Sequence, residues 1–517
     1  VITVASDFFR MSKFPGLRLF VVSVIVSFGG SFHFGYQLVI TNPSQSAFLA
    51  FLNSSFASNY GSTLGVTKAE TIWSVIVAIL FVGAIVGSLS LELVGEKLGR
   101  KRGMYLSFTI TTIAVAASMV SFFINSFELY SVSRVLTGYS LGLSLGLIAL
   151  YLNESSPKEC RGFVSMMVGV MVQFGTVIGS ILAMPSIFGT TNDWWHIYLV
   201  ECIIVLFVLL ALPFMPESPG YLMLCGDETA ARKSILFFRC YKPDEVDAVL
   251  HEIKENLKQN AKALSVFQVW NQRQTRKGTI VGMAISLSMA FSGIAGKQKQ
   301  KKTPENNAAL DFNRFGKGNN FRRLTCKNHL AIVMSSFTVD RYGRRPLILI
   351  SNWAILLLNV TIVSLMYCFN KFHYSWIGYT LVAIISLFII FFAIGPGPLC
   401  YFITAEMVGQ SAKAAAQSWA SFTQMSSRAL VLAIYLPIAN QIGQAFAYLS
   451  LFIAPTAIGL IFLYFNMPET KNKNHNEVLE AVTNLPSVSK ILRPKSAAVE
   501  PHDFVASNDF SCAVEKF

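Results

Sequence analysis

Residues 71–102 read TIWSVIVAILFVGAIVGSLSLELVGEKLGRKR, an apolar run over residues 71–95 followed closely by a basic cluster. A helix needs about 20 apolar residues to cross the hydrocarbon core of a bilayer. Lysine and arginine gather in the cytoplasmic loops of membrane proteins. This stretch therefore predicts a helix that crosses a membrane and ends in the cytoplasm.

Similar apolar runs recur along the rest of the chain. Of its 517 residues, 53% are hydrophobic and 14% are charged, whereas soluble domains carry about 25% charged residues. We therefore predict an all-α membrane protein whose twelve transmembrane helices form two six-helix halves. The other eleven runs lie at residues 17–40, 103–124, 128–151, 163–184, 195–215, 278–296, 330–339, 346–369, 376–400, 414–438 and 445–466.

The polar stretches between the runs divide the chain into five predicted regions. These are a cytoplasmic N-terminus (1–16), a first half (17–216), a cytoplasmic helical linker (217–277), a second half (278–469) and a cytoplasmic tail (470–517). The tail contains several prolines and little periodicity, which is typical of disorder. Both termini are therefore expected in the cytoplasm.

An internal repeat supports the division into two halves. The motif EKLGRK at residues 96–101 recurs as DRYGRR at residues 340–345, an offset of 244 residues. Glu154 recurs as Glu406 with an offset of 252 residues. Such near-constant offsets indicate a duplicated six-helix unit, as in transporters built from parallel repeats.

The net charge of +14 fits a membrane protein with basic cytoplasmic loops. Nucleic-acid binding would require a basic soluble domain with aromatic stacking positions, and none is evident. A nucleotide loop, a metal cluster and a nucleophile motif are also missing, so we expect no enzyme, cofactor or metal site. The triplet Asn53-Ser54-Ser55 is an N-glycosylation sequon in the loop after the first helix. The charge rule places that loop outside the cell, so we predict a glycan on Asn53.

Five kinds of motif, in order along the chain, resemble the signature of the sugar-porter family of the major facilitator superfamily. The nearest branch is the animal facilitative hexose transporters of solute carrier family 2. The resemblance implies the major facilitator fold and uniport of a hexose or similar small polar solute, with a monosaccharide as the expected partner, by alternating access at the plasma membrane. The motifs are the repeated pair at 96–101 and 340–345, NESSP with Arg161-Gly162 at 153–162, PESP at 216–219, GPGP at 395–398 and PETK at 468–471.

The resemblance also assigns a role to the charged motifs. It implies that ion pairs at the cytoplasmic helix ends link the two halves in the outward-open state and separate in the inward-open state. Partial burial makes such pairs matter more than pairs on an open surface. The residues are Glu96, Arg100, Lys101, Glu154, Arg161 and Glu217 in the first half, and Asp340, Arg344, Arg345, Glu406, Lys413 and Glu469 in the second.

Gly395, Pro396, Gly397 and Pro398 interrupt the tenth apolar run. Proline removes backbone donors and glycine permits unusual backbone angles, so we predict a broken helix. The resemblance implies that the break is a hinge, and a simple kink is the alternative.

Four polar or aromatic residues are predicted to contact the substrate. Gln173 lies in an apolar run and matches a sugar-binding glutamine of the family, and a buried polar side chain in a membrane is costly without partners. Gln37 stands where relatives often have asparagine, and Tyr401 where many have tryptophan. Gln424 stands where relatives keep a polar residue.

The seventh helix departs from the family. Relatives carry a Gln-Gln-Leu-Ser-Gly-x-Asn motif there, whereas residues 289–295 read MAFSGIA. The cavity is then less polar than a glucose site, so a different hexose, a polyol or an organic anion such as urate remains an alternative. The first helix carries no Asp or Glu, where proton-coupled sugar porters usually have an acid, which favours uniport. A non-transporting relative is the competing interpretation.

Residues 297–330 do not fit their place in this plan. They hold nine lysines and arginines against two acidic residues, and each central Lys or Arg costs about 2.5–3.5 kcal/mol in a spanning helix. The run at 330–339 is also too short to cross a bilayer. Two hypotheses stay open: a translated intron or frame error in the gene model, and a real insertion that leaves a protein unable to transport.

Overall fold

The computed structural model describes most of the chain, and every regular element in the described ranges is a helix. The described residues are 15–157, 159–239, 246–247, 249–251, 253–254, 264–293, 343–372, 375–471, 473, 477–478 and 480–481.

Some predictions fall outside these residues. They concern Asp340, the basic segment 297–330, the short run at 330–339 and nearly all of the predicted tail.

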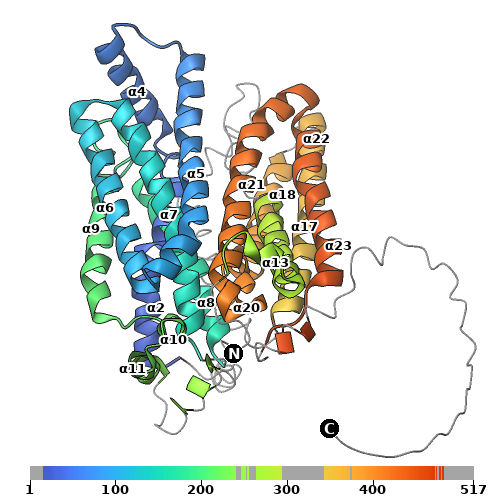
Figure 1. The fold of residues 1–517 in the computed structure, drawn as a ribbon. Helices are drawn as coiled ribbons and strands as arrows, with labels where there is room; N and C mark the ends of the chain where they lie inside the picture. Colours follow the sequence, from blue (N-terminus) through green and yellow to red (C-terminus); the bar gives the residue numbers. More distant parts are fainter. Residues whose placement is uncertain are drawn as a thin grey trace, which may run out of the picture.

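The first half forms one bundle of long helices, coloured blue to green in Figure 1. The break at Gly30 divides the first predicted helix into two pieces, α2 and α3. The bundle consists of α2 (Leu17–Gly29), α3 (Ser31–Val39), α5 (Val66–Lys97), α6 (Arg100–Ile124), α7 (Phe127–Ser155), α8 (Arg161–Leu182), α9 (Trp195–Ala211) and the short η1 (Leu212–Phe214).

The second half forms a separate bundle beside it, coloured yellow-green to red in Figure 1. Its long helices are α13 (Arg273–Phe291), α17 (Arg344–Phe372), α18 (Ser375–Ile394), α21 (Lys413–Ile442) and α23 (Ala454–Asn466). Its short elements are η2 (Gln268–Trp270), α19 (Pro396–Leu399), α20 (Ile403–Met407), η3 (Gln410–Ala412), α22 (Gln444–Tyr448) and η4 (Leu449–Ile453).

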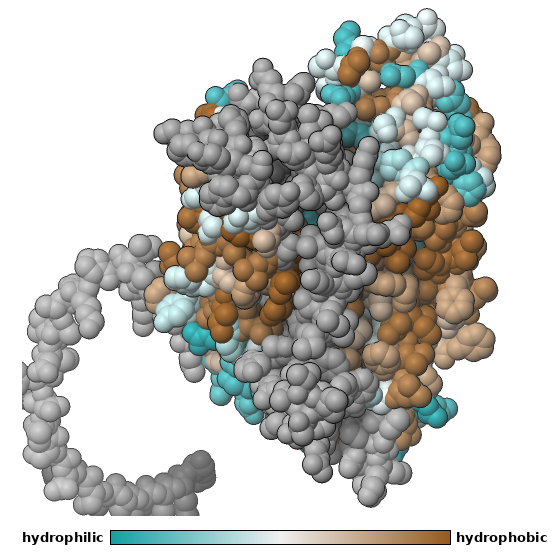
Figure 2. Space-filling view, turned by 180° about the vertical axis from the view of Figure 1, so that it is seen from behind, coloured by the Kyte–Doolittle hydropathy of each residue, from teal (hydrophilic) through white to brown (hydrophobic). Residues whose placement is uncertain are grey.

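The apolar character of its helices shows that the molecule is an integral membrane protein. Eight of the described helical spans are long and apolar enough to cross a membrane. Figure 2 shows a broad hydrophobic surface with hydrophilic residues toward its two ends. Eleven of the twelve predicted apolar runs coincide with described helices, and the twelfth is the run at 330–339.

The helices of the first half approach one another closely at glycines. A Cβ atom placed on Gly35 of α3 would lie 1.7 Å from the carbonyl oxygen of Val172 in α8. One placed on Gly138 of α7 would lie 1.9 Å from the carbonyl oxygen of Leu80 in α5. Small residues allow this approach between membrane helices, which associate through close packing.

Basic residues gather at one end of the molecule, which we call the basic end. Two helices that follow the first half, α10 (Pro219–Leu224) and α11 (Glu228–Arg239), lie at this end, below the first bundle in Figure 1. They agree with the helical linker predicted there. The basic residues at the helix ends are Arg100, Lys101, Arg161, Arg344, Arg345 and Lys413.

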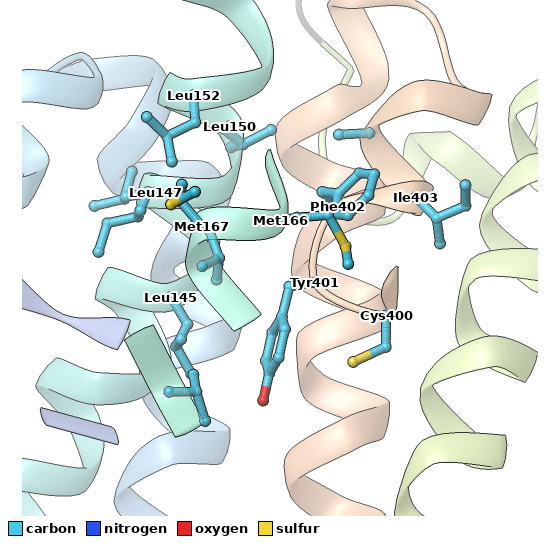
Figure 3. Close-up of a cluster of buried hydrophobic side chains, with 14 of the residues drawn as sticks. Leu145, Leu147, Leu150, Leu152, Met166, Met167, Cys400, Tyr401, Phe402 and Ile403 are labelled. Carbon is cyan, nitrogen blue, oxygen red and sulfur yellow. The ribbon is translucent and has the colours of Figure 1, made fainter. Parts of the chain in front are cut away.

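The two halves pack against each other near the basic end, where α21 lies along α5 and α7, and α19 meets α8. Figure 3 shows the apolar part of this contact, in which Leu145 and Met167 of the first half face Tyr401 of the second. Polar contacts accompany it, because the backbone N–H of Glu92 donates to Ser418 Oγ over 3.2 Å.

One helix at the opposite end was not predicted. Residues of the loop after the first span form α4 (Gln45–Tyr60). Asn53 lies on this helix rather than in an extended loop, and the hydroxyl of Ser55 in the same sequon is buried and accepts from the backbone N–H of Phe127 over 2.9 Å. Glycosylation of Asn53 stays a prediction.

Candidate functional site

A cluster that we call the first charge box joins three helix ends at the basic end. Arg100 of α6 donates from Nη2 to Glu154 Oε1 of α7 over 2.9 Å, and the two side chains are 1% and 0% exposed. Glu154 also accepts from the hydroxyl of Ser218. Glu217 accepts the backbone N–H of Lys101 at 3.0 Å, which places a carboxylate at the N-terminus of α6. Burial raises the pKa of Glu217 above its ordinary value, and these N–H donors oppose that shift.

The second charge box repeats this arrangement in the second half. Arg344 of α17 donates from Nη2 to Glu406 Oε1 of α20 over 3.3 Å, and the side chains are 3% and 5% exposed. Thr470 Oγ1 donates to Glu406 Oε2 over 2.8 Å. Glu469 accepts the backbone N–H groups of Arg344 and Arg345 over 2.9 and 3.1 Å. The predicted internal repeat is therefore present as a repeat of contacts.

The glycine in each repeated motif has a structural reason. Gly99 and Gly343 precede α6 and α17 with φ angles of 91° and 93°, a region that glycine occupies readily and other residues avoid. A Cβ atom on either would lie 2.7 or 2.6 Å from a carboxylate oxygen of Glu217 or Glu469. The glycine thus lets the carboxylate reach the helix N-terminus.

Two ion pairs of the predicted network differ from the expectation that these pairs join the halves, because Arg100–Glu154 and Arg344–Glu406 each lie within one half. A link between the halves by the other residues of the network stays a prediction. The pairs hold helix ends together inside a half, because their arginine and glutamate lie on two different helices of that half. Glu96 lies half-buried beside Arg100.

Lys413 makes a polar contact between the halves at this end. Its ammonium group donates to Asn153 Oδ1 of α7 over 3.2 Å. The charges that act on Lys413 come from both sides, with Arg161 and Glu154 in the first half and Glu406 in the second. The charge boxes therefore border the contact between the halves.

The predicted helix break is confirmed, because α18 ends at Ile394 and the short α19 follows Gly395. Pro398 in α19 lies against the first half. A Cβ atom on Gly169 of α8 would lie only 2.2 Å from Pro398 Cβ. The break thus forms part of the contact between the halves, and whether it acts as a hinge stays a prediction.

Gln37 lies in a buried polar network of the first half. Its amide nitrogen donates to Glu201 Oε2 of α9 over 2.6 Å, and its amide oxygen accepts from Arg134 Nη1 of α7 over 2.6 Å. His33 Nδ1 lies 3.2 Å from Glu201 Oε1. Both ends of the Gln37 amide therefore have protein partners, and a substrate would reach this side chain only if the network opened.

Charge balance in this network gives a stability prediction. Glu201→Gln removes the buried carboxylate that accepts from Gln37 and lies 3.2 Å from His33 Nδ1, and weakening the hydrogen bonds of a buried charged group costs about 1–3 kcal/mol or more. We expect the purified variant to melt several degrees below the wild type in a thermal unfolding assay in detergent. Glu228→Gln, at an exposed ion pair with Lys254, serves as the control and should leave the melting temperature unchanged. Equal melting of Glu201→Gln and the control would refute the role of the charge.

Gln173 lies on α8, partly exposed. Its amide oxygen accepts from Thr176 Oγ1, one turn later, over 3.4 Å. Among the described residues, the Gln173 side chain has no other hydrogen bond. The neighbouring Val172 and Gly175 pack against α3. A substrate contact by Gln173 stays a prediction.

Tyr401 and Gln424 come together in the second half, close to a residue that the sequence analysis missed. Gln424 Nε2 lies 3.2 Å from Cys400 Sγ and 3.5 Å from Met289 Sδ. Arg428, one turn further along α21, donates from Nη2 to Met289 Sδ over 3.2 Å. A single arginine in the apolar run at 414–438 was the signal that could have revealed it.

Comparison with known proteins identifies the family. The sequence model of the "Sugar (and other) transporter" family matches residues 22–297 and 323–481. The chain belongs to this family. It is therefore a membrane transport protein and not an enzyme. The match is interrupted over residues 298–322, inside the segment that the sequence analysis found out of place.

Relatives of this sugar transporter family member include mouse solute carrier family 2, facilitated glucose transporter member 9, which is 27% identical over 91% of this chain and 87% of its own length. The sheep facilitated glucose transporter member 3 is 29% identical over 90% of this chain and 92% of its own length. The resemblance to solute carrier family 2 is thus confirmed.

Solved structures show the fold. The proton:xylose symporter XylE bound to 6-bromo-6-deoxy-D-glucose superposes with a TM-score of 0.73 at 19% identity, covering 91% of this chain and 100% of that one. The inward open conformation of XylE from E. coli gives a TM-score of 0.63 at 19% identity, covering 90% and 99%. The chain therefore has the major facilitator fold.

Proposed function

We propose that this sugar transporter family member carries a hexose or similar small polar solute across the plasma membrane by alternating access. The observation that carries this proposal is the pair of charge boxes. Each box fastens helix ends inside its own half, so each half can move as a body. The contacts of Lys413 with Asn153, of Ser418 with Glu92 and of Pro398 with Gly169 join the halves, and none of them is an Arg–Glu pair of a box, so these contacts could break while the Arg100–Glu154 and Arg344–Glu406 pairs stay closed.

The contacts at the basic end define the state that we propose for this structure. If the basic end faces the cytoplasm, as the positive-inside rule requires, the halves are closed toward the cytoplasm. Release of the solute inside the cell then requires Lys413 to leave Asn153, Ser418 to leave Glu92 and Pro398 to leave Gly169. Rocking of two repeats around a site near the membrane midplane is the general mechanism for such folds.

The solute would bind between the halves. We propose that Gln173 contributes from the first half, and Tyr401 and Gln424 from the second. Gln37 supports this wall of the site through its bonds to Glu201 and Arg134.

Uniport gives the first functional prediction. The first helix, α2 with α3, contains no carboxylate, so we expect saturable uptake that is the same with and without a pH gradient. The measurement is uptake of radiolabelled glucose, fructose, a polyol and urate in oocytes that express the full chain, at external pH 5.5 and 7.5. Surface protein is quantified in the same cells.

Each result of this measurement has a meaning. Saturable uptake of one compound supports the proposal and names the solute class. Uptake that rises in proportion to the inward proton gradient would replace uniport by proton symport and would draw attention to His33 and Glu201. Surface protein without any uptake would favour the non-transporting interpretation.

A further inference from the structure

Arg428 reaches across the contact between the two halves from the middle of α21. It lies 15 residues after Lys413, which corresponds to roughly 22 Å along a helix, and its side chain is only 8% exposed. Its guanidinium group lies 5.1 Å from the ring centroid of Phe34, which belongs to α3 of the first half. A buried cation therefore sits between the halves, deep in the membrane-spanning part of the protein.

The described structure supplies no counter-ion for this cation. The sequences of α13, α17, α18, α21 and α23 contain no aspartate or glutamate. None of the ion pairs among the described residues includes Arg428. Glu201, a buried carboxylate of the first half, is already bonded to Gln37 and His33. Ionisable residues within membrane helices are rare and usually pair with one another, so an arginine without such a pair indicates a functional site.

Arg428 and its neighbour Gln424 direct N–H groups at sulfur atoms. Arg428 Nη2 and Gln424 Nε2 both point at the sulfur of Met289, and Gln424 Nε2 also points at the sulfur of Cys400. These sulfur atoms are weak acceptors. The Tyr401 hydroxyl is buried and lies beside Arg428 and Gln424. Figure 3 shows its ring projecting between the two halves. We call Tyr401, Gln424 and Arg428 the donor cluster.

The N–H groups of this cluster favour a solute that accepts hydrogen bonds. A neutral sugar hydroxyl both donates and accepts, whereas an ionised carboxylate only accepts and offers about four lone-pair positions. Arginine binds a carboxylate with two parallel hydrogen bonds, and such charged bonds are about twice as strong as neutral ones. An incoming carboxylate would thus provide both the missing charge and the missing acceptors.

We propose that the donor cluster binds the carboxylate of a small organic anion of monosaccharide size, such as a sugar acid, and that Arg428 selects for it. This inference rests on the proposed transport function and names the charge of its solute. The position fits, because solute sites of this fold lie near the midplane at the interface between the repeats.

The proposal has an electrical consequence. Uniport of a monovalent anion moves one negative charge per turnover, and a membrane potential of 100 mV changes the equilibrium distribution of such a charge by about 50-fold. A negative interior therefore opposes uptake of the anion, and depolarisation favours it. Uptake of a neutral sugar by the same protein has no such dependence at equilibrium.

The test compares glucuronate with glucose, which differ by one carboxylate, and includes urate as an anion of a different shape. Uptake is measured in oocytes that express the full chain as wild type, Arg428→Gln and Arg428→Lys, with surface protein quantified. We expect glucuronate uptake to exceed glucose uptake, to rise on depolarisation and to fall at least tenfold in Arg428→Gln. Arg428→Lys keeps the charge and should retain part of the activity.

The same variants are then purified, and the melting temperature is measured with each compound, so that binding is followed without transport. The inference is supported if glucuronate, and not glucose, raises the melting temperature of the wild type and has no such effect on Arg428→Gln. If that result is obtained without any uptake, the inference stands and only the proposed transport function fails. Uptake or stabilisation by glucose only overturns the inference and leaves the transport function standing. Equal glucuronate binding by wild type and Arg428→Gln also overturns it, as does the absence of stabilisation by glucuronate, whether or not urate stabilises the protein.

Discussion

Glu154→Ala is expected to lower the free energy of unfolding by about 3–5 kcal/mol, because it leaves the Arg100 guanidinium buried without its carboxylate. The loss is this large because the pair is almost fully shielded from water, with a bond of 2.9 Å. The hydroxyl of Ser218 loses its acceptor in the same variant. Thermal unfolding of the purified protein in detergent measures the effect, and uptake at equal surface protein shows whether transport is lost with it.

Two matched variants make the expectation specific. Glu406→Ala removes the equivalent carboxylate of the second charge box, where the bond to Arg344 is longer at 3.3 Å and slightly more exposed, so its effect should be smaller. Asp247→Ala removes a partner of Arg232 in a pair whose side chains are 43% and 61% exposed, and such surface pairs contribute about 0–1 kcal/mol. If all three variants melted alike, burial of the charge boxes would not be the source of their stability.

Gly169→Ala is expected to reduce transport at least tenfold without preventing the fold. The new Cβ atom would lie 2.2 Å from Pro398 Cβ and 2.6 Å from Pro398 Cα, so the two halves could no longer close at the basic end as they do here. The variant should therefore favour the state that is open at that end. Uptake at equal surface protein and thiol labelling of single cysteines introduced at the basic end measure the two effects.

The matched control is Gly459→Ala in α23. Its nearest atom would be Ser288 Cβ at 3.9 Å, an ordinary contact, and alanine is favoured over glycine within a helix by roughly 0.5–1 kcal/mol. We expect this variant to transport like the wild type and to melt slightly higher. Normal transport and unchanged labelling in Gly169→Ala would mean that α8 and α19 do not have to touch during the cycle.

Much of the fold could be predicted from the sequence because membrane helices carry a strong local signal. A continuous apolar run about 20 residues long has few alternatives in a bilayer, and eleven such runs coincide with described helices. The helix α4 was not predicted because its sequence, QSAFLAFLNSSFASNY, mixes apolar and polar residues and contains no apolar run long enough to indicate a membrane-spanning helix. The break within the first span at Gly30 also left no clear sequence signal beyond a pair of glycines.

The candidate site was predicted less completely, since contacts between distant helices leave little trace in local sequence. The charge boxes could be located from their motifs, yet the motifs do not say whether Glu154 pairs with Arg100 of the same half or with a residue of the other. Glu201 and Arg428 were missed for a related reason. Each is a single charged residue in an apolar run, and only the packing of α9 on α3 and of α21 on α3 shows what it faces.

The order of residues in the charge boxes has a consequence for synthesis of the chain. In each half the arginine and its paired glutamate precede the last two long helices, whereas Glu217 with Ser218, and Glu469 with Thr470, come after the last helix of that half. The box can therefore close only when every helix of its half has emerged from the ribosome and entered the bilayer. Because chains fold from the N-terminus during synthesis, we expect each box to be completed as one of the last steps in the assembly of its half. A half that inserts incorrectly would be left with an unsatisfied buried charge, by which quality control could recognise it.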